Sequence, residues 1–328
     1  MYSKIFKITL FISSLLFVLN TSVTDASLPN VQNYKRVVVI SDAHYPSKTN
    51  KFTHPQLWQQ KINNKLQVVK DVNSWTDVNL IAVTGDLVAL TGNNLERRQA
   101  KEYFAKYNKP LAIIAGNHEF TYKDKLNSKD RLVHATLQEK AAKLQDFKDT
   151  FELKDLYYTK HLGNYELFFL SCEPVSGKYS CELSDKQLNW LNKKLASHRS
   201  RPTIIFFHAP LIDTLAKDTP ILKKGSLYAE PYQKLDQILS KNPQVKLWVS
   251  GHTHTPPTNP SFNTPQNKHL GILDIYNPTL DGKQVWTNSL YLYPDRIIVK
   301  TFDHQKRVFL DQFNRTVLIN ELAKSKAA

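Results

Sequence analysis

The chain has 328 residues, of which 41% are hydrophobic and 11% aromatic, so it is long and apolar enough to fold around a core and is not a disordered chain. Its formal net charge is +15, which could attract anionic substrates or membrane surfaces. No run of lysine and arginine is dense enough to indicate a nucleic-acid-binding patch. We therefore interpret the excess charge as a lysine-rich solvated surface and expect no nucleic-acid partner other than a possible substrate.

The first 26 residues are typical of a secretory signal peptide. Lys4 and Lys7 precede the apolar run ITLFISSLLFVLN, and the small residues of TSVTDAS follow it, with a cleavage site after Ala26. The apolar run is shorter than the roughly 20 residues that a membrane span needs. We therefore expect a cleaved signal peptide, a secreted or periplasmic protein, and no stable membrane insertion afterwards. An uncleaved membrane anchor is the alternative.

Beyond this segment, short apolar runs alternate with stretches of helical pattern. Several runs are rich in Val, Ile and Phe and lack a strict alternation of apolar and polar residues, which is typical of strands covered on both faces. We predict strands at residues 36–40, 80–84, 111–115, 166–171, 203–208 and 246–250. We predict helices at residues 55–74, 94–107, 128–150, 184–197 and 231–240, the fourth with Ser184 as its N-cap.

The last part of the chain has a different texture. Residues 255–278 are rich in Pro, Asn and Thr and are predicted to form a long loop. The runs SLYLYP and RIIVKTFD then read as two strands joined by a turn at Pro294 and Asp295. This order of elements indicates a layered α/β architecture with a central sheet, formed by a single domain over residues 27–328.

Five of the apolar runs end in side chains suited to metal binding. In chain order they are VVVISDAH, LIAVTGD, LAIIAGNHE, TIIFFHAP and KLWVSGHTH. A lone His or Asp at a strand end is usually structural, but in α/β sheets ligands gather at the carboxyl ends of strands, so five such ends indicate one crevice. The candidate site residues are Asp42, His44, Asp86, Asn117, His118, Glu119, His208, His252 and His254.

The chemistry of these side chains favours particular cofactors. Carboxylates, imidazoles and one amide oxygen suit divalent or trivalent ions such as Mn, Fe or Zn, and there is no thiolate set. The donors outnumber what one ion needs, and a carboxylate can bridge two ions, so we expect two metal ions. Two metals about 3.5–4 Å apart can generate a hydroxide and hold the attacking and leaving oxygens of a phosphoryl centre.

The order D-x-H, G-D, G-N-H-E, H and G-H-x-H resembles the calcineurin-like metallophosphoesterase superfamily, and these motifs span residues 42–254. The segment ELSDKQLNWL is also similar to a helix of the cyclic-nucleotide-phosphodiesterase-like and sphingomyelinase-like members. The resemblance implies a four-layer αββα sandwich, two β-sheets flanked by helices, with a dinuclear metal site at the carboxyl ends of the strands.

The resemblance also implies the role of each site residue. Two ligand sets would share Asp86 as a bridge. The first set is Asp42, His44, Asp86 and His254. The second set is Asp86, Asn117, His208 and His252. His118 would bind no metal; it would stabilise the transition state and protonate the leaving oxygen.

One position departs from the pattern of well-known members. Purple acid phosphatases carry a ligand tyrosine three residues after the bridging aspartate, and many other members carry an aspartate there or nearby that orients the catalytic histidine. Here that position is Ala89, so we expect a non-purple enzyme in which another group or water orients His118. Glu119 is either a support behind the ligands or an ordinary solvated carboxylate.

The two cysteines, Cys172 and Cys181, are separated by eight residues. Outside the cytoplasm such a pair often oxidises, and a loop of this length is easily closed, so we favour a disulfide over two free thiols.

The sequence therefore predicts a secreted phosphoesterase that hydrolyses a phosphate-ester substrate, with phosphodiesters favoured, by in-line attack of a metal-bound hydroxide. A phosphomonoesterase and a phospholipid-headgroup hydrolase are the alternatives within this class. A secreted nuclease is disfavoured because the lysines are dispersed. A metal-binding scaffold that kept the fold is the non-enzymatic alternative, although none of the expected ligands is missing. The sequence does not indicate an oligomeric state.

Overall fold

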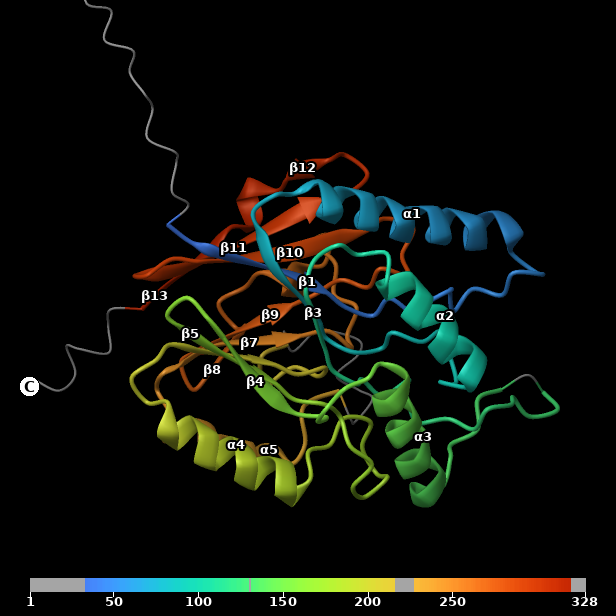
Figure 1. The fold of residues 1–328 in the computed structure, drawn as a ribbon, viewed down its shortest axis with the longest axis horizontal. Coiled ribbons are helices and arrows are strands. Elements are labelled where there is room, and N and C mark those ends of the chain that lie inside the picture. The colour runs from blue at the N-terminus through green and yellow to red at the C-terminus, as the bar shows by residue number, and fades with distance from the viewer. Residues whose placement is uncertain (1–32, 130, 216–226, 320–328) are drawn as a thin grey trace, which may run out of the picture. The chain divides into compact units, whose positions relative to one another are not determined.

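Two β-sheets with helices on their outer sides make up the part of the protein that the computed structural model describes, residues 33–129, 131–215 and 227–319 (Figure 1). The predicted signal peptide lies outside these residues. No helix among the described residues has the length and apolar character that crossing a membrane requires.

The first sheet joins strands from both ends of the described chain. β1, β2 and β3 pair in parallel, and β10 pairs with β1 in the antiparallel direction, which gives the order β12-β11-β10-β1-β2-β3 with β13 on β11. Its strands are β1 (Lys35–Ile40), β2 (Val78–Val83), β3 (Leu111–Ile113), β10 (Trp286–Leu292), β11 (Arg296–Asp303), β12 (Val308–Phe309) and β13 (Arg315–Leu318).

The second sheet comes from the middle of the chain and has the order β4-β5-β6-β7-β9-β8. β5, β6, β7 and β9 pair in parallel, and the two edge strands are antiparallel to their neighbours. Its strands are β4 (Tyr158–Leu162), β5 (Tyr165–Phe169), β6 (Thr203–Phe206), β7 (Val245–Ser250), β8 (Lys268–His269) and β9 (Ile272–Tyr276).

Helices cover the outer faces of the sheets. In Figure 1, α1 lies along the first sheet and α4 and α5 lie along the second. The helices are α1 (Pro55–Ser74), α2 (Asn94–Phe104), α3 (Leu137–Thr150), α4 (Asp185–Ser197) and α5 (Tyr232–Leu239), with short 3₁₀ turns at Pro260–Phe262 and Asp311–Phe313.

Alternate residues of β1 show how the layers are joined. Val37 belongs to a core cluster that contains only residues of the two sheets and their ends, including Phe206 of β6. Val38 points to the opposite face and belongs to the cluster that contains Val68 of α1. Because successive side chains of a strand face opposite ways, both faces of β1 are buried, one by a sheet and one by a helix.

The αββα fold that the resemblance implies is therefore confirmed, and the single central sheet that we read from the element order is wrong. The physical reason is that a strand buried between two helical layers and a strand buried between a sheet and a helix have the same apolar sequence pattern.

Several boundaries differ from the prediction by a few residues, β4, β12 and β13 were not predicted, and two differences are larger. The helix expected over residues 128–150 begins at Leu137, because Thr136 caps it: the Thr136 hydroxyl accepts from the Glu139 N–H, and the Glu139 carboxylate accepts from the Thr136 N–H. The predicted loop at residues 255–278 contains β8 and β9. Asp274 interrupts the apolar pattern of β9, yet it is buried and accepts hydrogen bonds from Ser250 and Leu211.

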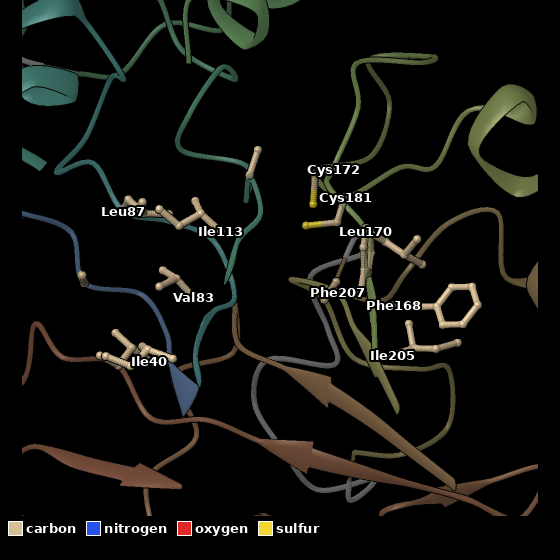
Figure 2. Packing of buried hydrophobic residues seen from close by; sticks show 14 of the residues in the cluster. Ile40, Val83, Leu87, Ile113, Phe168, Leu170, Cys172, Cys181, Ile205 and Phe207 are labelled. Carbon is tan, nitrogen blue, oxygen red and sulfur yellow. The ribbon is translucent and has the colours of Figure 1, made fainter. Parts of the chain in front are cut away.

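The predicted disulfide is not formed, which corrects the interpretation of the cysteine pair. Cys172 and Cys181 are free, fully buried thiols, and their sulfur atoms lie near each other in the apolar cluster that Figure 2 shows. Burial, together with the hydrogen bond to Cys181, raises the pKa of the Cys172 thiol well above its usual value. Both cysteines pack among residues such as Leu170 and Phe207 as small apolar side chains.

Candidate metal centre

Polar side chains that follow β1, β2 and β3 of the first sheet and β6 and β7 of the second sheet come together at one place. Asp86 follows β2 of the first sheet and His208 follows β6 of the second, and the Asp86 Oδ2 and His208 Nε2 atoms are 3.3 Å apart. His254, which follows β7, lies 3.1 Å from Asp42 Oδ1 through its Nε2 atom. The crevice expected from the sequence is thus built from strand ends of both sheets.

Backbone conformation at these strand ends is unusual. Five of the seven predicted ligands have positive φ angles, between 42° and 62°: Asp42, His44, Asp86, His252 and His254. A non-glycine residue in this left-handed region costs on the order of 1–2 kcal/mol. Main-chain hydrogen bonds hold the turns, for instance from the His44 N–H to the Asp86 carbonyl oxygen at 2.9 Å. Such strain persists only where the surroundings impose it, and it is characteristic of functional sites.

The first predicted ligand set is brought together. One ligand atom from each of its four residues lies within 4.8 Å of the others, and the set could hold a metal ion: Asp42, His44, Asp86 and His254. The His44 Nε2 and His254 Nε2 atoms are 3.2 Å apart, and His44 Nε2 lies 3.8 Å from Asp86 Oδ2.

The second predicted set also gathers around Asp86. His208 Nε2 is 3.2 Å from Asn117 Oδ1 as well as 3.3 Å from Asp86 Oδ2, and the His208 and His252 rings are 4.9 Å apart. Cys181 joins this group: its sulfur and one nitrogen from each of His208 and His252 lie within 4.8 Å of one another. No pattern in the sequence indicates a thiol beside these histidines.

The imidazoles present their Nε2 atoms to the carboxylates. His44 Nδ1 lies 3.2 Å from the Val88 carbonyl oxygen, and His208 Nδ1 lies 2.8 Å from the Thr84 carbonyl oxygen. Because a carbonyl oxygen only accepts, Nδ1 carries a proton in each ring. Burial lowers the pKa of His208, but the charge of Asp86 outweighs this and raises the pKa well above its usual value, so Nε2 of His208 must release a proton before it can bind a metal. Burial and the charge of Lys48 hold the pKa of His44 well below its usual value, which keeps this ring neutral as a metal ligand must be.

The residues fit two metal ions on chemical grounds as well. Asp42 Oδ1 is buried and accepts no hydrogen bond from the described residues, although His254 Nε2 is close. Buried carboxylate oxygens are almost always satisfied, so this atom fits a bound cation. Burial raises the pKa of Asp86, but the charge of His208 outweighs it and the pKa lies well below the usual value. Oxygen and imidazole nitrogen donors of this kind suit divalent transition metals.

Glu119 is not an ordinary solvated carboxylate, because it lies buried behind the candidate ligand Asp86. Its side chain is fully buried and accepts from the N–H groups of Asp86 at 2.9 Å, Leu87 at 2.7 Å and Gly116 at 2.6 Å. These bonds tie the turn after β2 to the turn after β3. Burial and the charge of Asp86 raise the pKa of Glu119 to about 7.

His118 lies beside the first ligand group, with its ring 4.9 Å from the ring of His44. The main-chain carbonyl oxygen of Leu90 lies 2.7 Å from Nδ1 and orients the ring. This carbonyl is the group that orients His118 in a chain with alanine at position 89. On the other side of the ring, the Lys48 ammonium lies 3.1 Å from Nε2. Because Nδ1 donates to the Leu90 carbonyl oxygen, Nε2 of His118 is the ring atom that can accept a hydrogen bond from Lys48.

A sequence model of the calcineurin-like phosphoesterase family matches residues 35–256, which contain every strand end described above. The chain belongs to this family. The resemblance read from the motifs is thereby confirmed, and with it the assignment to a family of metal-dependent phosphoester hydrolases.

Curated relatives of this phosphoesterase are distant. The 3′,5′-cyclic adenosine monophosphate phosphodiesterase CpdA of Escherichia coli (strain K12) is 26% identical over 220 residues, which cover 67% of this chain and 69% of that protein. The uncharacterized protein YvnB of Bacillus subtilis (strain 168) is 23% identical over 244 residues, which cover 72% of this chain but only 16% of that much longer protein.

Solved structures share the fold at low sequence identity. A dimetal phosphatase from Danio rerio superposes with a TM-score of 0.56 at 16% identity, over 87% of this chain and 99% of that chain. The purple acid phosphatase PPD1 from yellow lupin also gives a TM-score of 0.56, at 14% identity, over 87% of this chain and 54% of that chain. These likenesses concern the fold alone.

A groove adjoins the metal centre of this calcineurin-like phosphoesterase. Its volume is about 560 Å³, and it begins at His254 and runs between α1 and the segment that precedes β10. Its lining is mixed, with amide side chains, prolines and one indole: Gln60, Pro256, Thr258, Gln284 and Trp286.

Proposed function

We propose that this protein is a metal-dependent phosphodiesterase that acts outside the cytoplasm. The observation that carries the proposal is the position of Asp86 between two donor groups: its Oδ2 atom is 3.8 Å from His44 Nε2 and 3.3 Å from His208 Nε2. One carboxylate oxygen shared by two sets of ligands is the arrangement that a pair of metal ions needs.

The chain's own residues have separable tasks in this proposal. Two divalent ions, when bound by the two ligand sets, would activate water and offset the negative charge of the phosphoryl group. His118 holds or releases a proton at Nε2, with Leu90 fixing the ring through Nδ1. Glu119 keeps Asp86 in place through the main chain. Burial lowers the pKa of His118 below its usual value, and the charge of Asp86 opposes this only in part.

The preference for a diester is supported by two observations. The relative CpdA bears the name of a cyclic-nucleotide phosphodiesterase, and the match covers about two thirds of each protein. The groove beside His254 offers space for a substituent on the phosphate that a monoester lacks. The position outside the cytoplasm is supported by the N-terminal sequence pattern alone.

An activity screen tests the reaction. The purified protein is reloaded with Mn²⁺, Zn²⁺ or Fe²⁺ and assayed with p-nitrophenyl phosphate, bis-p-nitrophenyl phosphate and p-nitrophenyl phosphorylcholine, with Asp86→Asn as the control that should lose metal. We expect the second substrate to be preferred. Preference for the first substrate would make the protein a monoesterase, and preference for the third would make it a headgroup hydrolase. Bound metal without any hydrolysis would favour a scaffold.

A separate experiment tests export. The full chain is expressed in a bacterial host, and the N-terminus of the protein recovered from the medium or periplasm is sequenced. We expect it to begin at Ser27. Recovery of the uncleaved chain in the membrane fraction would favour the anchor.

A further inference from the structure

Lys48 occupies a position that the metal centre does not explain. It lies four residues after His44, is half-buried, and its Nζ atom is 3.1 Å from His118 Nε2. Among the described residues, no carboxylate lies within ion-pair distance of this ammonium, whereas lysines such as Lys61 and Lys65 both pair with Asp281. Two of its three N–H donors therefore remain for another acceptor.

Hydrogen bonds to Asp281 and Lys65 hold the segment that carries Lys48 in place. Asp281, which is 233 residues further along the chain, accepts from the Lys48 main-chain N–H at 3.1 Å and from the Ser47 hydroxyl at 2.7 Å. The fully buried Lys65 ammonium donates to Asp281 at 2.7 Å and to the Pro46 carbonyl oxygen at 2.6 Å. Because these bonds fix the main chain, the Lys48 side chain starts from a defined point beside the site.

The charge of the Lys48 ammonium indicates what this side chain could bind. The Lys48 ammonium lies beside the first ligand group, because the His118 ring that it contacts is 4.9 Å from the ring of His44. A centre that binds two cations would repel a further ammonium unless an anion lay between them. The oxygens of a phosphate ester are such an anion, and charge-assisted hydrogen bonds to them are among the strong ones.

We propose that Lys48 is a substrate-binding residue that donates a hydrogen bond to a non-bridging oxygen of the phosphoryl group, next to His118. The inference rests on the proposed function, since it concerns the same site. It predicts a contribution shared by monoesters and diesters, because the contact is to the phosphoryl group and not to the leaving group.

Binding of inorganic phosphate tests the inference independently of turnover. Isothermal titration calorimetry on the Mn²⁺-loaded protein would compare the wild type with Lys48→Met, Lys48→Arg and the control Lys51→Met. Lys51 is exposed, three residues away, with its ammonium over the Trp58 ring, so the control removes the same charge outside the site. We expect phosphate affinity to fall about 10- to 100-fold in Lys48→Met, to recover partly in Lys48→Arg, and to stay unchanged in Lys51→Met.

Two further readouts keep the result interpretable. Metal content and thermal unfolding should match the wild type in Lys48→Met, because the Asp281 contact uses the main chain. The kcat/KM values for p-nitrophenyl phosphate and bis-p-nitrophenyl phosphate should fall by a similar factor. Wild-type phosphate affinity in Lys48→Met, or a loss confined to one leaving group, would overturn the inference. Phosphate binding that depends on Lys48 in a protein without esterase activity would instead overturn the proposed function and leave this inference standing.

Discussion

The carbonyl oxygen of Leu90 lies 2.7 Å from Nδ1 of His118, so the main chain orients the imidazole next to the metal centre. A main-chain acceptor performs this task as well as a carboxylate, because it fixes both the tautomer and the ring plane. It adds no negative charge, however, and this leaves the charge of Lys48 uncompensated on the other side of the ring. The alanine at position 89 is therefore compatible with an ordered His118.

His118→Ala should separate catalysis from metal binding. The ring contacts Leu90 and Lys48 and belongs to neither ligand set. We expect turnover to fall by ~10²–10⁴, while metal content measured by inductively coupled plasma mass spectrometry stays at the wild-type value. His161→Ala, which removes a half-exposed imidazole on β4, should leave both unchanged. Full activity in the His118 variant would exclude the proton-transfer role.

Asp86→Asn should cost metal as well as activity. This carboxylate belongs to both predicted ligand sets, and an amide supplies one neutral oxygen in place of a charged, bridging group. We expect the loss of metal affinity, followed by titration with Mn²⁺, to exceed the ~10–100-fold typical of a lost outer partner. A variant that retains both ions with wild-type affinity would show that Asp86 does not bridge.

Asp274 should give the protein a stability that depends on pH. Burial raises its pKa to about 7 from an ordinary value of 3.8, so between about pH 4 and pH 7 the folded state holds a proton that the unfolded state lacks. Its contribution to stability is therefore complete below about pH 4 and is lost as the pH rises through about 7.

Urea unfolding of the wild type and Asp274→Asn at several pH values measures this effect. The difference in free energy of unfolding between the two proteins should change by about 1.4 kcal/mol per pH unit within this window and level off outside it. Parallel stability curves across the window would show that Asp274 is ionised in the folded protein.

The cysteines should behave as two protected thiols. Both are fully buried, and burial with the hydrogen bond between them raises the pKa of Cys172 well above its usual value, which suppresses the reactive thiolate. Titration with 5,5′-dithiobis(2-nitrobenzoic acid) should find two thiols in denaturant and slow reaction in the native protein. Absence of reactive thiols in denaturant would indicate that the pair oxidises after all.

The strand ends could be read from the sequence because each is a local pattern. An apolar run followed by Asp42 and His44, or by Asn117 and His118, marks both the strand and the side chains that leave it. The direction of a parallel strand then fixes the edge at which those side chains emerge. Local sequence patterns were thus sufficient for the strand ends that carry the candidate ligands and for most helices.

The remaining parts of the site depend on tertiary contacts that carry no local signal. Every residue type has a main-chain carbonyl, so the sequence at position 90 does not indicate that this carbonyl orients His118. Lys48 resembles a surface lysine in the sequence, because its hydrogen bond to the distant Asp281 is a tertiary contact. β9 escaped prediction because the buried Asp274 resembles a loop residue when its partners are unknown. Cys181 reaches His208 through packing that its sequence spacing does not encode.

Asp86 and His208 lie close together although they follow strands of different sheets and come from distant parts of the chain. An ion held there would act as a reversible cross-link between the two sheets. By mass action it would stabilise only the folded protein, by an amount that grows with the logarithm of the free metal concentration. The availability of metal would then set the lifetime of the protein against proteolysis as well as its rate of turnover.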